Sequence, residues 1–264
     1  MARAIFSGAI SFGLVHIPIK IYSATESKGI KLHMLCPECH SPLEYKRWCP
    51  KCQKEVSWQN IEKGFKISKD KYVILKKEDL EKIKLPTSKT IDIKTFVDIS
   101  QIDPILFEKS YFVVPSEGGE KPYSLFVEAL RLSNKAAIGK VVMRQKEYLV
   151  ALRPFKKGIV MHVLYYLEEV KDIEKLPELE KLVVVSKEEL ELAKALIENL
   201  TQEEFDLSKF KDEYAEALKE LIKAKMEGRE FSLEKKKGAE EAKSLMEMLK
   251  ASVESVEKKK KKEE

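Results

Sequence analysis

The four cysteines of the chain lie close together, in two Cys-x-x-Cys pairs. Cys36 and Cys39 form the first pair and Cys49 and Cys52 the second, with nine residues between the pairs. This spacing is typical of a tetrahedral four-thiolate zinc site, and a site with four protein ligands is structural rather than catalytic. Two disulfides, or four unrelated thiols, are the alternatives. We expect a structural Zn²⁺ in a zinc-ribbon-like hairpin over about residues 33–58.

Basic residues are concentrated in two blocks of the chain. Residues 28–75, which include the cysteines, carry ten basic and five acidic side chains, and residues 131–160 carry eight basic side chains against Glu147 alone. Residues 161–228 are acidic, with ten basic against eighteen acidic side chains. Such segregation favours a polyanionic partner that is bound by a defined face of the protein, although an ordinary solvated surface would also contain these lysines.

Within the two blocks, we expect the side chains at strand ends and on polar faces to contact DNA phosphates. Contacts of this kind give binding that is independent of sequence and sensitive to salt. The candidate DNA-binding residues are Lys31, Lys46, Arg47, Lys63, Lys66, Arg131, Lys140, Arg144, Lys146 and Arg153.

No motif for catalysis stands out. The chain has no Walker loop, GxSxG, HExxH or GxGxxG sequence. We interpret His16 and His162 as hydrogen-bonded structural histidines in apolar strands, whereas His33 and His40 bracket the first cysteine pair, where either could orient a thiolate or replace one as a ligand. No run of about 18 apolar residues is present, so we expect no membrane span. The N-terminal sequence MARAIFSGAIS lacks a basic region followed by a long apolar core, so we expect no signal peptide.

The N-terminal part of the chain, which must position these residues, is predicted to consist mainly of strands. Residues 10–22 alternate apolar and polar positions, with a change of phase near Gly13–Leu14 that indicates a bend between two strands, although Pro18 disfavours a central place for the second strand. Further strands are expected at 64–75, 90–96, 111–114 and 135–164, together with a short helix from Lys77. A helix is expected over 121–134, with an apolar face of Leu125, Phe126, Ala129, Leu130 and Leu132. Several strands with inserted helices predict an α+β, mainly β fold around an antiparallel barrel or sandwich.

From Ser186 the pattern becomes helical. A capping box at Ser186–Glu189 begins one amphipathic helix, Thr201–Glu204 predicts another helix start, and a long helix follows from Phe210 to near Gly228. We therefore divide the chain into a core of strands with the cysteine hairpin inserted (1–185), a helical appendage (186–228) and a Lys/Glu-rich extension (229–264) with a helix over about 239–256.

Four blocks of the sequence, in order, resemble the prokaryotic Ku proteins of DNA double-strand-break repair. The blocks are MARAIFSGAISFGLVHIPIKIYSA, TIDIKTFVDISQIDPILFEKSYFVVP, QKEYLVALRPF and KFKDEYAEALKELIKAK, and the resemblance covers about residues 1–228. It implies a cytoplasmic, nucleoid-associated homodimer without enzymatic activity, in which a β-barrel and a bridge close a ring around a double-stranded DNA end. It also implies that the cysteine hairpin lies in the inserted bridge of the 1–185 core and that the helices of residues 186–228 are a dimerisation arm that reaches over the partner. Finally, it implies recruitment of an ATP-dependent DNA ligase in non-homologous end joining.

Many members of that family lack the full cysteine set, so the expectation of zinc depends on the spacing in this sequence. Two other functions are considered beside the DNA-end-binding ring. A zinc-ribbon transcription or chromatin factor would show specific footprints, and a nuclease or nucleotidyltransferase would depend on carboxylates assembled from distant strands.

Overall fold

The computed structural model describes residues 3–69, 71–83, 89–143, 146–231 and 252. The chain divides into two compact units, Met1–Lys171 and Asp172–Glu264. The expected helix over about 239–256 falls outside the described residues, apart from Ser252. In the described residues, no helix is long and apolar enough to cross a membrane.

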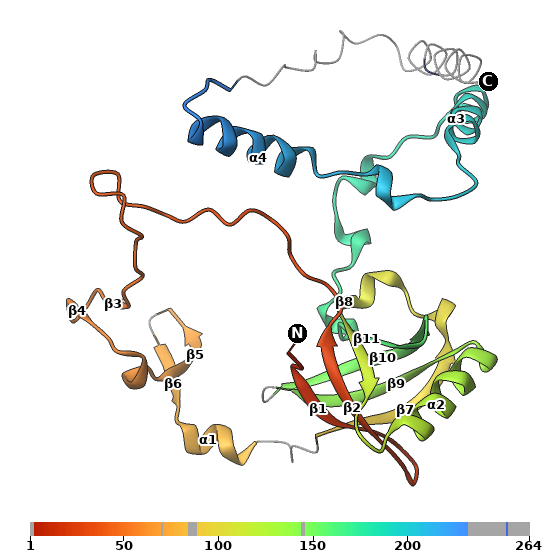
Figure 1. Cartoon of the computed structure of the whole chain (residues 1–264), viewed down its shortest axis with the longest axis horizontal. Helices are drawn as coiled ribbons and strands as arrows, with labels where there is room; N and C mark the ends of the chain where they lie inside the picture. Colours follow the sequence, from red (N-terminus) through yellow and green to blue (C-terminus); the bar gives the residue numbers. More distant parts are fainter. Residues whose placement is uncertain (1–2, 70, 84–88, 144–145, 232–251, 253–264) are drawn as a thin grey trace. The chain divides into compact units, whose positions relative to one another are not determined.

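Seven strands of the first unit form a closed barrel in the order β1-β2-β8-β11-β10-β9-β7 (Figure 1). Their bounds are β1 Phe6–Phe12, β2 Val15–Ser23, β7 Thr90–Asp98, β8 Phe107–Pro115, β9 Lys135–Met143, β10 Lys146–Phe155 and β11 Gly158–Leu164. The predicted barrel is confirmed. Its neighbouring strands are antiparallel except at the closure, where β1 and β7 run parallel with Ile10 opposite Ile91.

The phase change near Gly13 is the turn of a hairpin between β1 and β2. Gly13 has a φ of 58°, a left-handed conformation that glycine adopts without a steric penalty. Pro18 lies within β2, between β1 and β8, contrary to the expectation of an edge position. The β2–β8 ladder ends at Ile19, and the Pro18 carbonyl accepts a hydrogen bond from Ser116 N–H at 3.0 Å just beyond that end. The ladder therefore needs no N–H from residue 18, and the strand tolerates a proline there.

The barrel interior and helix α2 (Glu120–Ser133) share one apolar core. Tyr123, Phe126, Val127 and Leu130 are the buried face of α2, at the i, i+3, i+4, i+7 spacing of an amphipathic helix. The predicted face was partly wrong, because Leu125 and Leu132 are 72% and 86% exposed. A second cluster, with Ile102, Ala136, Ala151 and Leu164 as its buried members, packs residues from the 97–107 connection against β9, β10 and β11.

The first unit also contains two small antiparallel hairpins and a short α-helix. They are β3 Trp48–Cys49 with β4 Lys54–Glu55, β5 Lys63–Ser68 with β6 Lys71–Leu75, and α1 Lys77–Lys82. The two strands and the helix predicted over residues 64–83 are therefore confirmed. Every residue of β5 is exposed, and an isolated two-stranded hairpin is only marginally stable in water.

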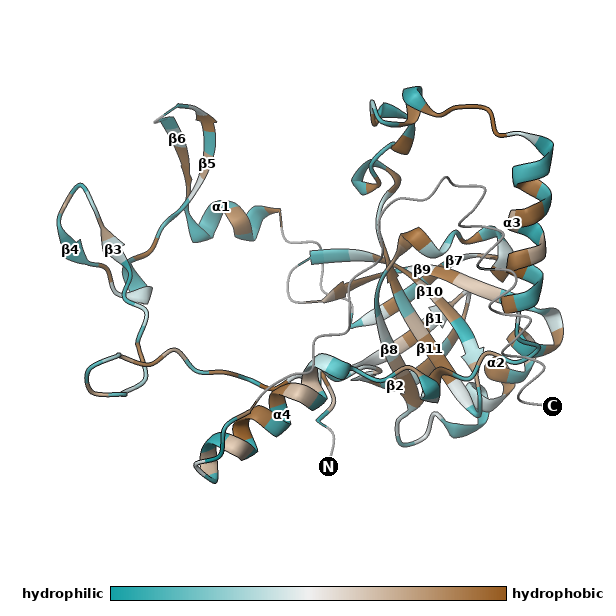
Figure 2. Ribbon diagram, turned by 90° about the horizontal axis from the view of Figure 1, so that it is seen from above, coloured by the Kyte–Doolittle hydropathy of each residue, from teal (hydrophilic) through white to brown (hydrophobic). Residues whose placement is uncertain are grey.

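The second unit contains α3 (Lys187–Leu200) and α4 (Glu213–Met226). The predicted capping box is present, because Ser186 Oγ accepts from Glu189 N–H at 3.2 Å and the Glu189 carboxylate accepts from Ser186 N–H at 2.9 Å. No helix begins at Thr201, which caps the C-terminal end of α3, and α4 begins after Asp212 rather than at Phe210. Figure 2 shows apolar positions along both helices as well as on the barrel strands.

Candidate nucleic-acid interface

Each cysteine pair lies in its own tight turn, and the two turns have the same local structure. In the first, Leu35 pairs with Pro42, and His40 N–H donates to the Cys36 carbonyl at 2.9 Å. In the second, β3 and β4 pair Cys49 with Lys54 across the turn. The residue after the second cysteine is left-handed in both turns, with φ of 55° at His40 and 48° at Gln53. The sequence therefore builds two copies of one cysteine knuckle.

The sulfur atoms interact within each knuckle. All four cysteines are free thiols. Hydrogen bonds from the side chain and backbone of Ser41, and then from Cys36, lower the pKa of Cys39 to about 7. Hydrogen bonds from the backbone and side chain of Cys52 lower the pKa of Cys49, while the same partnership raises the pKa of Cys52.

The two knuckles are not brought to a common point. Among the described residues, which include all four cysteines, no group of three or more His, Cys, Asp or Glu side chains is close enough to hold a metal ion. Each knuckle offers two soft sulfur donors of the kind zinc prefers, and each is already folded. The four-cysteine site remains a prediction, which requires the knuckles to approach each other.

The candidate DNA-binding residues of the first basic block are all exposed: Lys31, Lys46, Arg47, Lys63 and Lys66. Lys46 forms an ion pair with Glu55 (Nζ–Oε2 3.3 Å), and the Arg47 guanidinium lies 4.4 Å from the ring centroid of Trp58. Exposed side chains that cost little to move can reach phosphates, so the structure leaves this block free to bind a polyanion.

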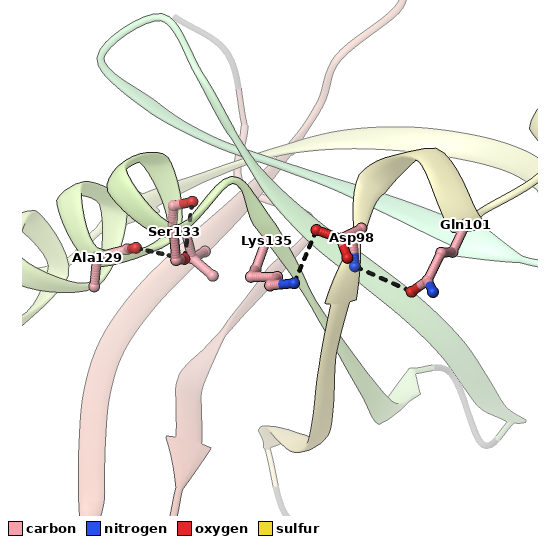
Figure 3. Close-up of polar contacts among 6 residues, drawn as sticks. Asp98, Gln101, Ala129, Ser133 and Lys135 are labelled. Atoms are coloured by element: carbon pink, nitrogen blue, oxygen red, sulfur yellow. Dashed lines mark hydrogen bonds and ion pairs between the residues drawn. The ribbon is translucent and has the colours of Figure 1, made fainter.

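In the second block, several cations already have partners within the barrel unit. Arg131 donates to Glu128 and to the carbonyl of Lys156, and therefore joins the end of α2 to the turn between β10 and β11. Its neighbour Lys135 forms an ion pair with Asp98 (Nζ–Oδ1 2.8 Å), which Figure 3 shows beside the hydrogen bond from Asp98 N–H to Gln101.

The candidate cations on the strands of this block also differ in whether a neighbouring side chain already binds them. Lys140 forms an ion pair with Glu147 at 2.8 Å, and that carboxylate raises the pKa of Lys140. Arg153 Nε donates to His162 Nε2 at 3.0 Å. Lys146 is exposed, with its ammonium 5.3 Å from the ring centroid of Tyr148, whereas Arg144 lies outside the described residues. Among the candidate DNA-binding residues of this block that the structure describes, Lys146 is thus the best placed for an external phosphate.

The two strand histidines have different environments. His162 is 7% exposed, stacks on Phe107, and shares a 2.8 Å hydrogen bond between its Nδ1 and Ser110 Oγ. Because Nε2 accepts from Arg153, Nδ1 carries the proton and donates to the serine, so the imidazole cannot act as a base toward Ser110. The structural interpretation is confirmed for His162. It is wrong for His16, which is exposed.

Sequence reasoning missed the aromatic residues beside the cysteines. Tyr45, Trp48 and Trp58 are all exposed, and Trp58 carries the Arg47 guanidinium on its ring. The interleaving of aromatic and basic residues from Tyr45 to Trp48 was visible in the sequence, but their exposure was not.

Comparison with known proteins identifies the family. Residues 11–192 match the family model described as "Ku70/Ku80 beta-barrel domain". The chain is 46% identical to the non-homologous end joining protein Ku of Archaeoglobus fulgidus, over 96% of this chain and 99% of the relative. It is 43% identical to the protein of the same name from Heliobacterium modesticaldum, over 100% of this chain and 95% of the relative, and 39% identical to that of Bacillus subtilis, over 95% and 81%. The chain belongs to the Ku family.

Proposed function

We propose that this chain binds the ends of double-stranded DNA as a homodimeric ring in non-homologous end joining, without reading sequence. The observation that carries the proposal is membership of the Ku family, with relatives that match nearly the whole chain and are named for end joining. Its function is binding rather than catalysis, in the cytoplasm and associated with the nucleoid.

The distribution of charge supports this function. The exposed lysines and arginine of residues 31–66, together with Lys146, can neutralise phosphates without reference to base sequence. The barrel is a closed sheet with an interior filled by side chains, so it supplies a rigid frame rather than a ligand cavity.

The apolar surface of the second unit supports the homodimer. Exposed apolar residues follow one another through this unit, and contiguous patches of this kind mark protein interfaces. The apolar residues of this unit that are more than half exposed include Leu182, Val183, Val184, Val185, Ile197, Leu200, Phe205, Leu207, Phe210, Tyr214 and Met226. We propose that residues 186–228 are the dimerisation arm, because a second copy of the chain would cover these side chains in a two-fold arrangement.

A comparison of DNA topologies tests the ring. Linear duplex DNA should bind well and closed circles of the same length much more weakly, because a ring loads over an end. Binding should weaken steeply with added salt, as expected for phosphate contacts. Equal affinity for the two topologies would contradict the ring, and footprints at particular sequences would favour a transcription or chromatin factor. Strand cleavage with added magnesium would favour a nuclease.

We also propose that a structural Zn²⁺ joins the two knuckles through Cys36, Cys39, Cys49 and Cys52. The shared backbone conformation of the knuckles and the soft donor set support it. The Cys36→Ser, Cys49→Ser double variant should lose bound zinc by elemental analysis, while Lys51→Ala, a change within the second turn that removes no sulfur, should keep it. Metal content that is the same in all three proteins would refute the site.

Finally, we propose that the DNA-bound dimer recruits an ATP-dependent DNA ligase. The end-joining role in the names of the relatives supports a partner that seals the break. Joining of linear DNA by such a ligase should be stimulated by the wild-type protein. Joining that the protein leaves unchanged or inhibits would contradict recruitment.

A further inference from the structure

Large aromatic side chains are exposed around the second cysteine knuckle. Tyr45, Trp48 and Trp58 are 83%, 60% and 72% exposed. Trp48 and Trp58 are also the two tryptophans of the whole chain. Rings of this size usually bury most of their surface, so a cluster left in water within one short segment points to a ligand with flat apolar faces.

The hairpin places a cation beside these rings. Val56 N–H donates to the Arg47 carbonyl at 2.8 Å and so extends the β3–β4 pairing by one residue. The Arg47 guanidinium then lies over the Trp58 ring, 4.4 Å from its centroid. The indole remains 72% exposed with the guanidinium in place, so a large part of its surface is open to a second stacking partner.

The charge around the rings is positive. Residues 44–58 contain four basic side chains, Lys46, Arg47, Lys51 and Lys54, against two acidic ones, Glu44 and Glu55. Glu55 is already paired with Lys46. Aromatic rings interleaved with cations are the surface that single-stranded nucleic acid uses, because bases stack on the rings while phosphates meet the charges.

We propose that this hairpin binds unpaired bases of single-stranded DNA, with Trp58 and Trp48 as stacking platforms and Arg47 as a phosphate contact. The inference rests on the proposed binding of DNA ends, and it adds that an end with a single-stranded tail is held more tightly than a blunt end. Paired bases inside a duplex are already stacked on each other, so only unpaired bases present free faces to the rings. If the rings instead bound a neutral apolar surface of another protein, the positive charge around them would have no partner.

The experiment compares a blunt duplex with the same duplex carrying an unpaired oligo(dT) tail, using the full-length protein. Because tryptophan occurs only in this hairpin, intrinsic tryptophan fluorescence reports on it without a label. The tail should quench the emission and raise the affinity about tenfold or more, the effect expected for stacking of at least one base. Trp58→Leu should remove most of that gain, measured as the ratio of the affinity for the tailed duplex to that for the blunt duplex. Tyr165→Leu, a change to a tyrosine that directly follows β11, should keep this ratio.

The outcomes separate this inference from the proposed function. Binding to the blunt duplex with no gain and no quenching from the tail would overturn the stacking site alone. Binding to the tail without binding to the blunt duplex would support the stacking site and contradict the end-binding function. Emission that changes with protein concentration but not with DNA would show that the rings form a protein interface, and would overturn the proposal.

Discussion

Tyr123 on α2 connects two barrel strands through its hydroxyl, and removing that hydroxyl should destabilise the barrel. The hydroxyl donates to the Val113 carbonyl at 2.6 Å and accepts from Ile159 N–H at 2.9 Å. Val113 in β8 and Ile159 in β11 are paired residues, so the hydroxyl stands where the two strands would otherwise bond directly. Gly158 makes room for it, because a Cβ there would lie 3.1 Å from the hydroxyl oxygen.

The magnitude of the loss follows from the burial of the site. Tyr123 is 4% exposed, so water cannot easily replace the hydroxyl in Tyr123→Phe. Each buried backbone group left without a partner costs about 1–3 kcal/mol, and two such groups predict a loss of about 2–6 kcal/mol. For a unit of this size each kcal/mol lowers the melting temperature by about 2–4 °C. Thermal unfolding followed by circular dichroism should therefore show a fall of about 4–24 °C.

A control and a pH series make this prediction specific. Tyr111→Phe removes the hydroxyl of a half-buried tyrosine in β8 and should cost much less. Burial raises the pKa of Tyr123, so the folded state favours the neutral phenol and the wild-type advantage is complete below about pH 10. That advantage should shrink as pH rises above about 10, because the unfolded chain ionises first. A loss no larger than that of Tyr111→Phe would refute the bridging role.

Three further predictions concern the barrel, the arm and the DNA contacts. Burial, and then the charge of Arg153, lower the pKa of His162, so acid below about pH 6.5 should destabilise the wild type, and His162→Gln should remove that acid sensitivity in urea unfolding curves. Ser186→Ala should cost α3 about 1 kcal/mol and reduce helical circular dichroism, since Glu189 N–H loses its cap. Lys146→Glu should weaken binding to linear DNA and lower the salt dependence by about one charge contact; an unchanged salt slope would show that this side chain faces away from DNA.

The barrel strands were predictable because each has a buried side and a local end signal. The alternation in β1 and β2 and the turn at Gly13 are properties of short segments. The parallel closure of β1 on β7 was not predictable, because it joins segments far apart in the chain. The predicted apolar face of α2 was wrong at Leu125 and Leu132 for a related reason. Helical spacing identifies an apolar stripe, but the barrel wall decides which side of that stripe is covered.

The candidate site was predictable in its residue types and less so in its geometry. Cysteine spacing led to two knuckles of one conformation, which the structure contains, but spacing alone does not bring four sulfurs together. The list of basic residues was drawn from charge, which does not distinguish a free cation from one held by a neighbour. Arg131, Lys140 and Arg153 proved to be bound within the barrel unit, whereas Lys46 and Arg47 have contacts that leave them exposed.

The contrast between the barrel and the second unit has a physical consequence for the dimer. The barrel buries its own core, so its folding does not require a partner. In α3, by contrast, no residue is fully buried, although its capping box fixes where the helix begins. A helix of this length is marginal in water without a packed apolar face, so a second copy of the chain that covers this face, as proposed above, would stabilise it. Binding of a partner stabilises by mass action, so under that proposal the order of α3 should depend on protein concentration while the barrel remains folded.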